Sequence, residues 1–199
     1  MTHDRSTAPP IGGVALLERA TGYTLGSLHL VTPAAMERPT PCRDWDLRAL
    51  LAHMDDALVA LQEAVDLACV DLDGSDGAGG EVAGGLDPVA RLRDRACRLL
   101  GSWTGADGSK PISIGGHELP ASVLTSAGAL EIAVHGWDVA QACGRRRPIP
   151  PSLASELLVI APFLVSEADR PMRFAPPVDL PSSASPSDKL IAYLGREPR

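Results

Sequence analysis

An apolar segment in the second half of the chain contains a glutamate and a histidine at helical spacing. Residues 128–137 are apolar nearly all the way round a helix, apart from Glu131 and His135, which are four apart and share one face. A buried carboxylate is costly unless it is paired or binds a metal. Three explanations stay open: Glu131 pairs with His135, it pairs with an arginine from elsewhere, or both residues hold a divalent metal with a histidine of another helix.

His53 is the candidate third ligand, because the positions around it at helical spacing are apolar and turn it toward the core. Two imidazoles and one carboxylate leave the fourth position of a zinc ion open to water or substrate, as in catalytic zinc sites. The same set with iron is a facial triad. The alternative is a half-buried histidine that is hydrogen-bonded to a neighbour.

Other polar residues lie close to these three in the sequence. Asp138 extends the face of the glutamate and histidine by another turn. There it would either orient a ligand histidine through its other ring nitrogen or be a surface charge or helix cap. Asp55 and Asp56 could also orient a ligand histidine, but we expect them to be surface charges or helix caps. Cys42 could line the site, but a small buried hydrophobe is the preferred interpretation. The remaining histidines are poor candidates for metal ligands: His3, His29 and His117. Two tryptophans, Trp45 and Trp137, are expected to be packing anchors.

The hydrophobic pattern predicts an all-α protein, a four-helix bundle with a short extra hairpin and C-terminal helices. Residues 1–10 are expected to be a flexible tail, residues 11–199 a single domain, and the glycine-rich residues 71–86 a mobile loop. Gly115 and Gly116 indicate the turn of the hairpin at 112–119. The first expected helix covers about 11–31, and the second runs from a cap at Asp44 or Asp46 to about 70. The third begins at Pro88, after a cap at Asp87, and ends near 103. The others are expected at about 121–143, 152–168 and 188–195.

Composition excludes several classes of function. The chain of 199 residues has a net charge of -7 and 4% aromatic residues, which is unfavourable for binding nucleic acid or anionic membranes. No apolar run reaches the roughly 18 residues of a membrane span. The N-terminus does not resemble a secretory signal, and four dispersed cysteines indicate reduced thiols, so we expect a cytoplasmic protein. Size and charge leave a homodimer open.

Three segments resemble actinobacterial DinB-like metal-binding proteins, which are relatives of mycothiol-dependent maleylpyruvate isomerase. Residues 40–45 (Thr-Pro-Cys-Arg-Asp-Trp), continued to His53, are similar to the first motif of that family. Residues 130–140, from Leu-Glu-Ile-Ala-Val-His to Ala140, resemble the second motif, and residues 188–196 resemble the terminal segment. Two lysines against sixteen arginines also indicate a GC-rich genome, such as an actinobacterial one.

The resemblance implies a four-helix bundle and a divalent metal, commonly zinc, with nickel or iron as alternatives. Carried over by motif, the ligands are His53, Glu131 and His135. Many DinB-like proteins have a third histidine at the position of Glu131, whereas the glutamate form is that of the isomerase. The resemblance also implies a low-molecular-weight thiol, mycothiol, as cosubstrate. The isomerase has an additional C-terminal domain, which this chain is too short to carry.

The expected function is therefore that of a metal-dependent enzyme of the thiol S-transferase or isomerase type, acting on a small electrophile. An open-site metal deprotonates a coordinating thiol, which raises its reactivity. One alternative is a non-catalytic module that binds metal or a small molecule. Another is a thiol-independent reaction on the same scaffold, such as hydrolysis or a step of secondary metabolism.

Overall fold

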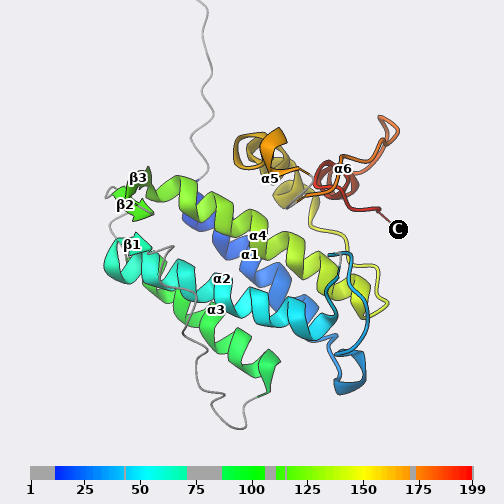
Figure 1. Cartoon of the computed structure of the whole chain (residues 1–199), viewed down its shortest axis with the longest axis horizontal. Helices are drawn as coiled ribbons and strands as arrows, with labels where there is room; N and C mark the ends of the chain where they lie inside the picture. The colour runs from blue at the N-terminus through cyan, green and yellow to red at the C-terminus, as the bar shows by residue number, and fades with distance from the viewer. Residues whose placement is uncertain are drawn as a thin grey trace, which may run out of the picture.

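Four long helices of the computed structural model pack side by side as a bundle, and two shorter helices pack against its side (Figure 1). The structure describes residues 12–42, 44–70, 87–105, 111–114, 116–170 and 174–198. The helices are α1 (Gly13–Leu28), α2 (Leu47–Leu67), α3 (Pro88–Gly105), α4 (Ala121–Ala142), α5 (Pro151–Leu164) and α6 (Pro186–Tyr193). Short 3-10 turns, η1 (Pro33–Ala35) and η2 (Glu167–Asp169), follow α1 and α5. The predicted all-α bundle with C-terminal helices is confirmed.

The predicted hairpin is also confirmed, and it belongs to a small three-stranded sheet. Strand β2 (Pro111–Ile114) pairs antiparallel with β3 (His117–Pro120), with Ile112 opposite Leu119. Strand β1 (Cys69–Val70) pairs parallel with β2, with Cys69 opposite Ser113. We did not predict β1, because two residues are too short for a periodic pattern. The sheet lies at the end of the bundle where α2 ends and α4 begins (Figure 1).

Helix α4 is the central element of the fold. It packs against α1, α2 and α5 and is buried around most of its circumference. The hydroxyl of Thr24 on α1 donates a hydrogen bond to the carbonyl of Ile132 at 2.7 Å. Gly136 lies opposite Thr24, and a side chain at this position would overlap the Thr24 hydroxyl. The glycine thus permits the close approach of α1 to α4. The largest fully buried side chains come from five helices and the loop before α5: Leu17, Leu47, Leu50, Leu51, Leu92, Leu99, Ile149, Leu153, Leu157, Leu190 and Ile191.

Several helix ends agree with their predicted caps. Asp46, rather than Asp44, caps α2, because its carboxylate accepts a hydrogen bond from the Ala49 amide at 2.8 Å. Asp87 accepts from the amide of Val89 before α3 at 3.2 Å. Helix α2 ends three residues earlier than predicted, since Ala68 adopts the left-handed conformation with φ 51°.

Helix α5 also ends earlier than predicted, at Leu164, and η2 follows it. The predicted tail at 1–10 and most of the predicted loop at 71–86 lie outside the described residues. Within the described part of the chain, no helix is both long and apolar enough to cross a membrane.

Candidate metal centre

The structure brings the three predicted ligand side chains together. Oε1 of Glu131 lies 2.7 Å from Nε2 of His53 and 2.9 Å from Nε2 of His135. His53 comes from α2, and the other two residues come from successive turns of α4. Of the three explanations for Glu131, pairing with an arginine is not seen, because its ion pairs within the described part of the chain are with the two histidines.

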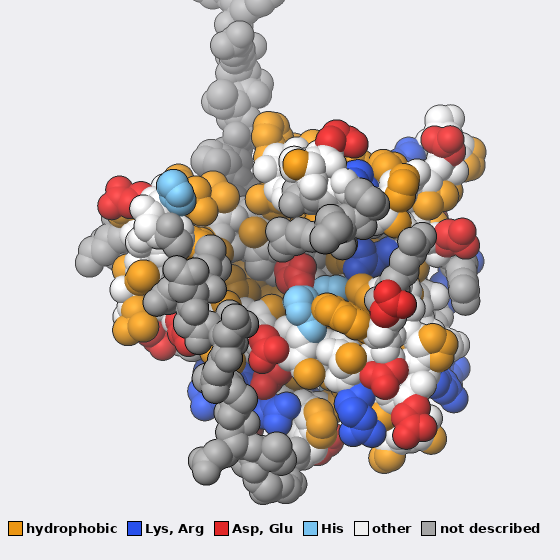
Figure 2. Space-filling view, in the orientation of Figure 1, with side chains coloured by type: hydrophobic (Ala, Val, Ile, Leu, Met, Phe, Trp, Pro, Cys, Tyr) orange, Lys and Arg blue, Asp and Glu red, His pale blue; other side chains and the backbone are white. Residues whose placement is uncertain are grey.

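The site is open on one side and buried on the other. The side chains of His53 and Glu131 are each 38% exposed, whereas that of His135 is 8% exposed. Figure 2 shows histidine side chains in a hollow in the middle of one face, with acidic and basic side chains around them. A small molecule can therefore reach the cluster from solvent without unfolding the bundle.

The segment before α2 positions His53. The ring of Trp45, one residue before the cap of α2, lies against the imidazole of His53 with centroids 4.7 Å apart. The Trp45 carbonyl also accepts hydrogen bonds from the amide and the hydroxyl of Thr40, at 3.1 and 3.0 Å. The hydrogen bonds between Thr40 and Trp45 thus hold the two ends of this motif together and place an aromatic ring next to one candidate ligand.

Asp138 lies behind His135, as the orienting interpretation predicts. Oδ2 of Asp138 is 2.9 Å from Nδ1 of His135, and the Asp138 side chain is fully buried. A carboxylate on one ring nitrogen fixes the tautomer and directs the other nitrogen outward, here toward Glu131. The surface-charge alternative for Asp138 is therefore wrong.

Hydrogen bonds and charges within the cluster shift the pKa values of Glu131 and His135. Burial alone would raise the pKa of Glu131, but hydrogen bonds from His135 and His53 hold it well below the usual range. Burial alone would lower the pKa of His135, but hydrogen bonds with Asp138, Cys42 and Glu131 raise it well above the usual value. These shifts favour an ionised Glu131 carboxylate beside a protonated His135, whose two ring nitrogens face the carboxylates of Glu131 and Asp138.

Sequence reasoning missed Arg196 as a member of the site. Its Nε lies 2.9 Å from Oδ1 of Asp138, and its Nη2 lies 2.8 Å from Oδ2. Nη2 is also 3.2 Å from Sγ of Cys42, which is half-buried and 3.4 Å from the same carboxylate. Burial would raise the pKa of Asp138, but the Arg196 charge lowers it. The C-terminal motif contained the residue but gave no signal of its partner.

The surface-charge interpretation of Asp55 is wrong. Its side chain is only 10% exposed and pairs with two arginines of α3, Arg95 at 2.6 Å and Arg91 at 3.0 Å. The neighbouring Asp56 is exposed, as predicted. Nε of each arginine pairs with one oxygen of the Asp55 carboxylate. Asp55 therefore joins α2 to α3 and is not part of the candidate site.

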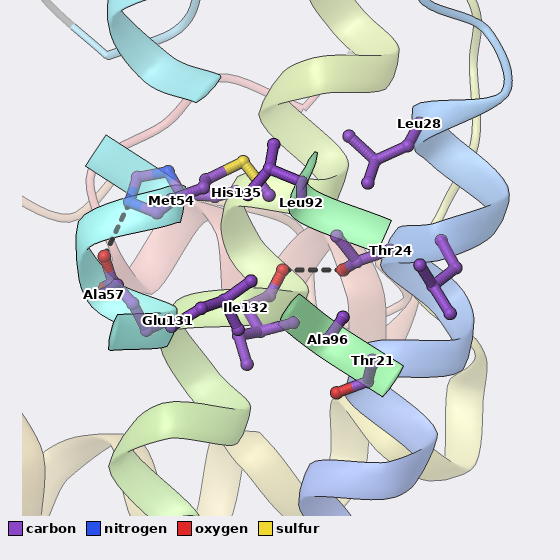
Figure 3. A pocket seen from close by; sticks show the side chains of 12 residues that line it. Thr21, Thr24, Leu28, Met54, Ala57, Leu92, Ala96, Glu131, Ile132 and His135 are labelled. Carbon is purple, nitrogen blue, oxygen red and sulfur yellow. Dashed lines mark hydrogen bonds and ion pairs between the residues drawn. The ribbon is translucent and has the colours of Figure 1, made fainter. Parts of the chain in front are cut away.

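A pocket lies on the inner side of the cluster, between α1, α2, α3 and α4 (Figure 3). Glu131 and His135 form one part of its wall, and the hydroxyl of Thr21 lies in another part. The Thr21 oxygen is buried and has no hydrogen-bond partner among the residues that the structure describes. Most of the lining is aliphatic: Leu25, Leu28, Met54, Ala57, Leu58, Leu92, Ala96 and Ile132. The cluster is thus polar toward solvent and apolar toward the core.

The donor set fits a divalent metal. One donor atom from each of His53, Glu131 and His135 lies within 4.8 Å of the others. Bonds from zinc to nitrogen or oxygen of about 2.0–2.2 Å require donors roughly 3–3.5 Å apart. The two measured separations from Glu131 are slightly shorter, so side-chain adjustments of a few tenths of an ångström suffice.

A second group of possible metal donors has similar spacing, but an arginine side chain lies against it. Cys42, His135 and Asp138 also lie within 4.8 Å of one another. The guanidinium of Arg196 contacts the cysteine and the aspartate of this group. Its positive charge disfavours a metal ion at the same place. The cluster of His53, Glu131 and His135 is therefore the better candidate for a metal.

Comparison with known families agrees with this geometry. Residues 17–140 match the family described as the mycothiol maleylpyruvate isomerase N-terminal domain. The chain belongs to this family. The match begins in α1 and ends in α4, so it includes the three candidate ligands and Asp138, whereas Arg196 lies beyond it.

Two relatives of this chain come from strains of Mycobacterium tuberculosis. They are named "Uncharacterized protein Rv0738", from strain H37Rv, and "Uncharacterized protein MT0763", from strain CDC 1551. Each is 28% identical over 173 residues, which covers 81% of this chain and 85% of the relative. No solved structure matches the chain.

Proposed function

We propose that this protein is a divalent-metal-dependent enzyme that uses a low-molecular-weight thiol, mycothiol, for S-transfer to a small electrophile or for its isomerisation. The observation that carries the proposal is the convergence of two imidazole nitrogens on one carboxylate oxygen of Glu131, at 2.7 and 2.9 Å. The thiol is suggested by the family, whose description names mycothiol.

Zinc is the metal that we favour, with nickel and iron as the alternatives. Two histidines and one glutamate are the protein ligands of known catalytic zinc sites, which keep a further position open. The exposed sides of His53 and Glu131 support an open position that solvent and small molecules can reach. Such a metal would act as a Lewis acid that lowers the pKa of a coordinated thiol or water.

The protein supplies orientation and a shielded environment. In this proposal His53, Glu131 and His135 hold the metal, and Asp138 keeps the His135 ring in one tautomer. Trp45 packs against the His53 ring at a tilt, with ring centroids 4.7 Å apart, and so supports its position. The aliphatic pocket behind Glu131 and His135 keeps bulk water away from the inner side of the cluster, which strengthens electrostatic interactions there.

The direct test is consumption of an electrophile by the zinc-loaded protein, with and without mycothiol. Maleylpyruvate would test isomerisation and 1-chloro-2,4-dinitrobenzene would test S-transfer. We expect the rate with mycothiol to exceed the thiol-free rate at least tenfold, and Glu131→Gln to abolish the difference. Glu118→Gln is the matched control, because Glu118 is an exposed glutamate of β3.

Other outcomes would point to the alternatives. Equal turnover with and without thiol would contradict the proposal and favour a metal-assisted hydrolysis. Tight binding of thiol or electrophile without turnover would contradict it in favour of a binding module. A metal with no exchangeable position, which raises the melting temperature but binds neither thiol nor azide, would favour a structural role.

A further inference from the structure

Arg196 connects the C-terminal segment to both parts of the chain that carry candidate ligands. Its guanidinium pairs with both oxygens of Asp138 on α4 and contacts Cys42 in the loop before α2. The Arg196 side chain is 11% exposed and that of Asp138 is fully buried. Planar two-point pairing of this kind is strong and geometrically restrictive.

The end of α6 determines where Arg196 lies. Gly195 follows the helix in the left-handed conformation with φ 77°, and a side chain there would overlap Ala175. The amide of Arg196 donates a hydrogen bond back to the carbonyl of Ile191 at 3.0 Å. Leu190 and Ile191 are fully buried. The docked helix and its glycine turn therefore direct the Arg196 side chain toward the bundle.

The pairing has a consequence for His135. Arg196 holds both oxygens of the buried Asp138 carboxylate, which keeps Oδ2 at 2.9 Å from Nδ1 of His135. Without this two-point contact, the Asp138 side chain would be free to rotate away from the ring. The ring would then lose the contact that directs Nε2 toward Glu131 and His53.

We propose that Arg196 is a positioning residue that keeps Asp138 aligned behind His135, so that the metal site is complete only when the C-terminal segment is docked. This inference rests on the proposed metal-binding function. The inference adds a coupling to that function, because metal binding at the cluster and docking of residues 186–196 would stabilise each other. Arg196 does not contact the metal position itself, because Asp138 and His135 lie between them.

The test uses the full-length protein and Zn²⁺ alone. Zinc affinity would be measured by competition with a chromogenic chelator for the parent, Arg196→Met and Arg196→Lys. We expect Arg196→Met to weaken zinc binding about 10–100-fold, the range found for residues that support metal ligands. Arg196→Lys keeps the charge but not the two-point geometry, so we expect partial recovery.

Arg170→Met is the matched control. Arg170 is another nearly buried arginine that holds the C-terminal segment, with hydrogen bonds to the carbonyls of Ala175 and Tyr193 at 2.5 and 2.8 Å. It does not contact the site. If Arg196 only stabilised the C-terminal helix, both substitutions to methionine would change zinc affinity alike; the proposal predicts that Arg170→Met stays within about threefold of the parent.

Hydrogen exchange gives a second readout, which does not depend on enzymatic activity. Adding Zn²⁺ should slow amide exchange in residues 186–196, and Arg196→Met should remove this effect. Zinc binding without protection of residues 186–196 in the parent, or equal zinc affinity in the parent and Arg196→Met, would overturn this inference alone. Failure of the parent to bind zinc would overturn the proposed function and the inference with it.

Discussion

Glu131 is the residue on which the two imidazoles converge. Nε2 of His53 and Nε2 of His135 lie 2.7 and 2.9 Å from its Oε1. A carboxylate oxygen accepts hydrogen bonds, so these two ring edges donate N–H groups to Glu131 at the place where a metal would bind. Both ring nitrogens of His135 face carboxylates, those of Glu131 and Asp138. A cation is therefore favoured at this position, whether it is a proton or a metal ion.

Binding of zinc should release a proton from His135. Its pKa is raised well above the usual value in the metal-free protein, so at neutral pH Nε2 carries a proton that the metal must displace. Zinc affinity should accordingly increase with pH for as long as His135 is protonated in the absence of metal, a range that extends above its usual pKa of about 6.5. Calorimetry at pH 7 in buffers of different ionisation enthalpy should give about one proton per zinc. Binding with no net proton release would contradict this description of the cluster.

For single residues, the sequence predicts which side chains could bind a metal better than it predicts which other residues contact them. His53, Glu131 and His135 could be selected because charged or titratable side chains within apolar helical faces are unusual. The interpretation of Asp55 was wrong because its partners, Arg91 and Arg95, belong to another helix. Arg196 could not be selected for the same reason, since nothing in its own surroundings indicates a contact with a distant carboxylate.

At the scale of elements, α4 determines the precision of the site. It supplies Glu131, His135 and Asp138 within two turns, and Asp138 and His135 fall on its buried side. Its closest neighbour is α1, where Thr24 bonds to the α4 carbonyl of Ile132. The position of the site therefore depends on close packing between these two helices.

Substitution of Gly136 by alanine should disturb that packing. The new methyl group would overlap the Thr24 hydroxyl and lie 3.1 Å from the Thr24 Cα, so α1 or α4 must move. We expect Gly136→Ala to lower the free energy of unfolding by about 1–3 kcal/mol, although alanine is the better helix former. Gly22→Ala on α1 is the control, because open space surrounds that position. It should raise the free energy of unfolding by about 0.5–1 kcal/mol. Denaturation with urea measures both changes, and equal effects would contradict the predicted overlap.

The ion pairs between α2 and α3 allow a second test at this scale. Removing the Asp55 carboxylate leaves Arg91 and Arg95 without their common partner. Because both arginines are about one-third exposed, we expect Asp55→Ala to cost about 1–3 kcal/mol, less than for a fully buried pair. The exposed Asp56→Ala should change the free energy of unfolding by less than about 0.5 kcal/mol. Similar losses for both variants would refute the structural role of Asp55.

Helices and their caps could be predicted because they depend on neighbours in the sequence. Asp46 and Asp87 act as caps within three residues of their partners, and the hairpin is equally local. Strand β1 could not be predicted, since its pairing with β2 brings together residues far apart in the chain. The early end of α2 at Leu67 follows from that pairing, because the chain leaves the helix to reach the sheet.

At the scale of the whole molecule, the candidate site lies where three parts of the chain meet. Helices α2 and α4 carry the candidate ligands, and the segment after α6 adds Arg196. These donors are brought together only in the folded protein, so the unfolded chain should bind metal much more weakly. If the cluster binds a metal as proposed, that binding would add directly to the stability of the fold.

Thermal unfolding should report this linkage. At a free zinc concentration of about 100 times Kd, the folded state should gain about 2.7 kcal/mol. For a chain of this size, the gain corresponds to a rise in Tm of roughly 5–10 °C. A chelator should reverse the rise, and Glu131→Gln should show little of it. A rise of the same size in Glu131→Gln would mean that zinc binds elsewhere.

The most direct test of the central claim is the metal content of the protein, purified without a metal-binding tag and without added metal. Elemental analysis of the parent should give close to one equivalent of zinc, nickel or iron. His53→Ala, Glu131→Gln and His135→Ala should lose it, whereas His29→Ala, at an exposed histidine that ends α1, should keep it. Absence of metal from the parent, even after reconstitution with zinc and dialysis, would contradict the account and leave Glu131 as the acceptor of two histidine hydrogen bonds.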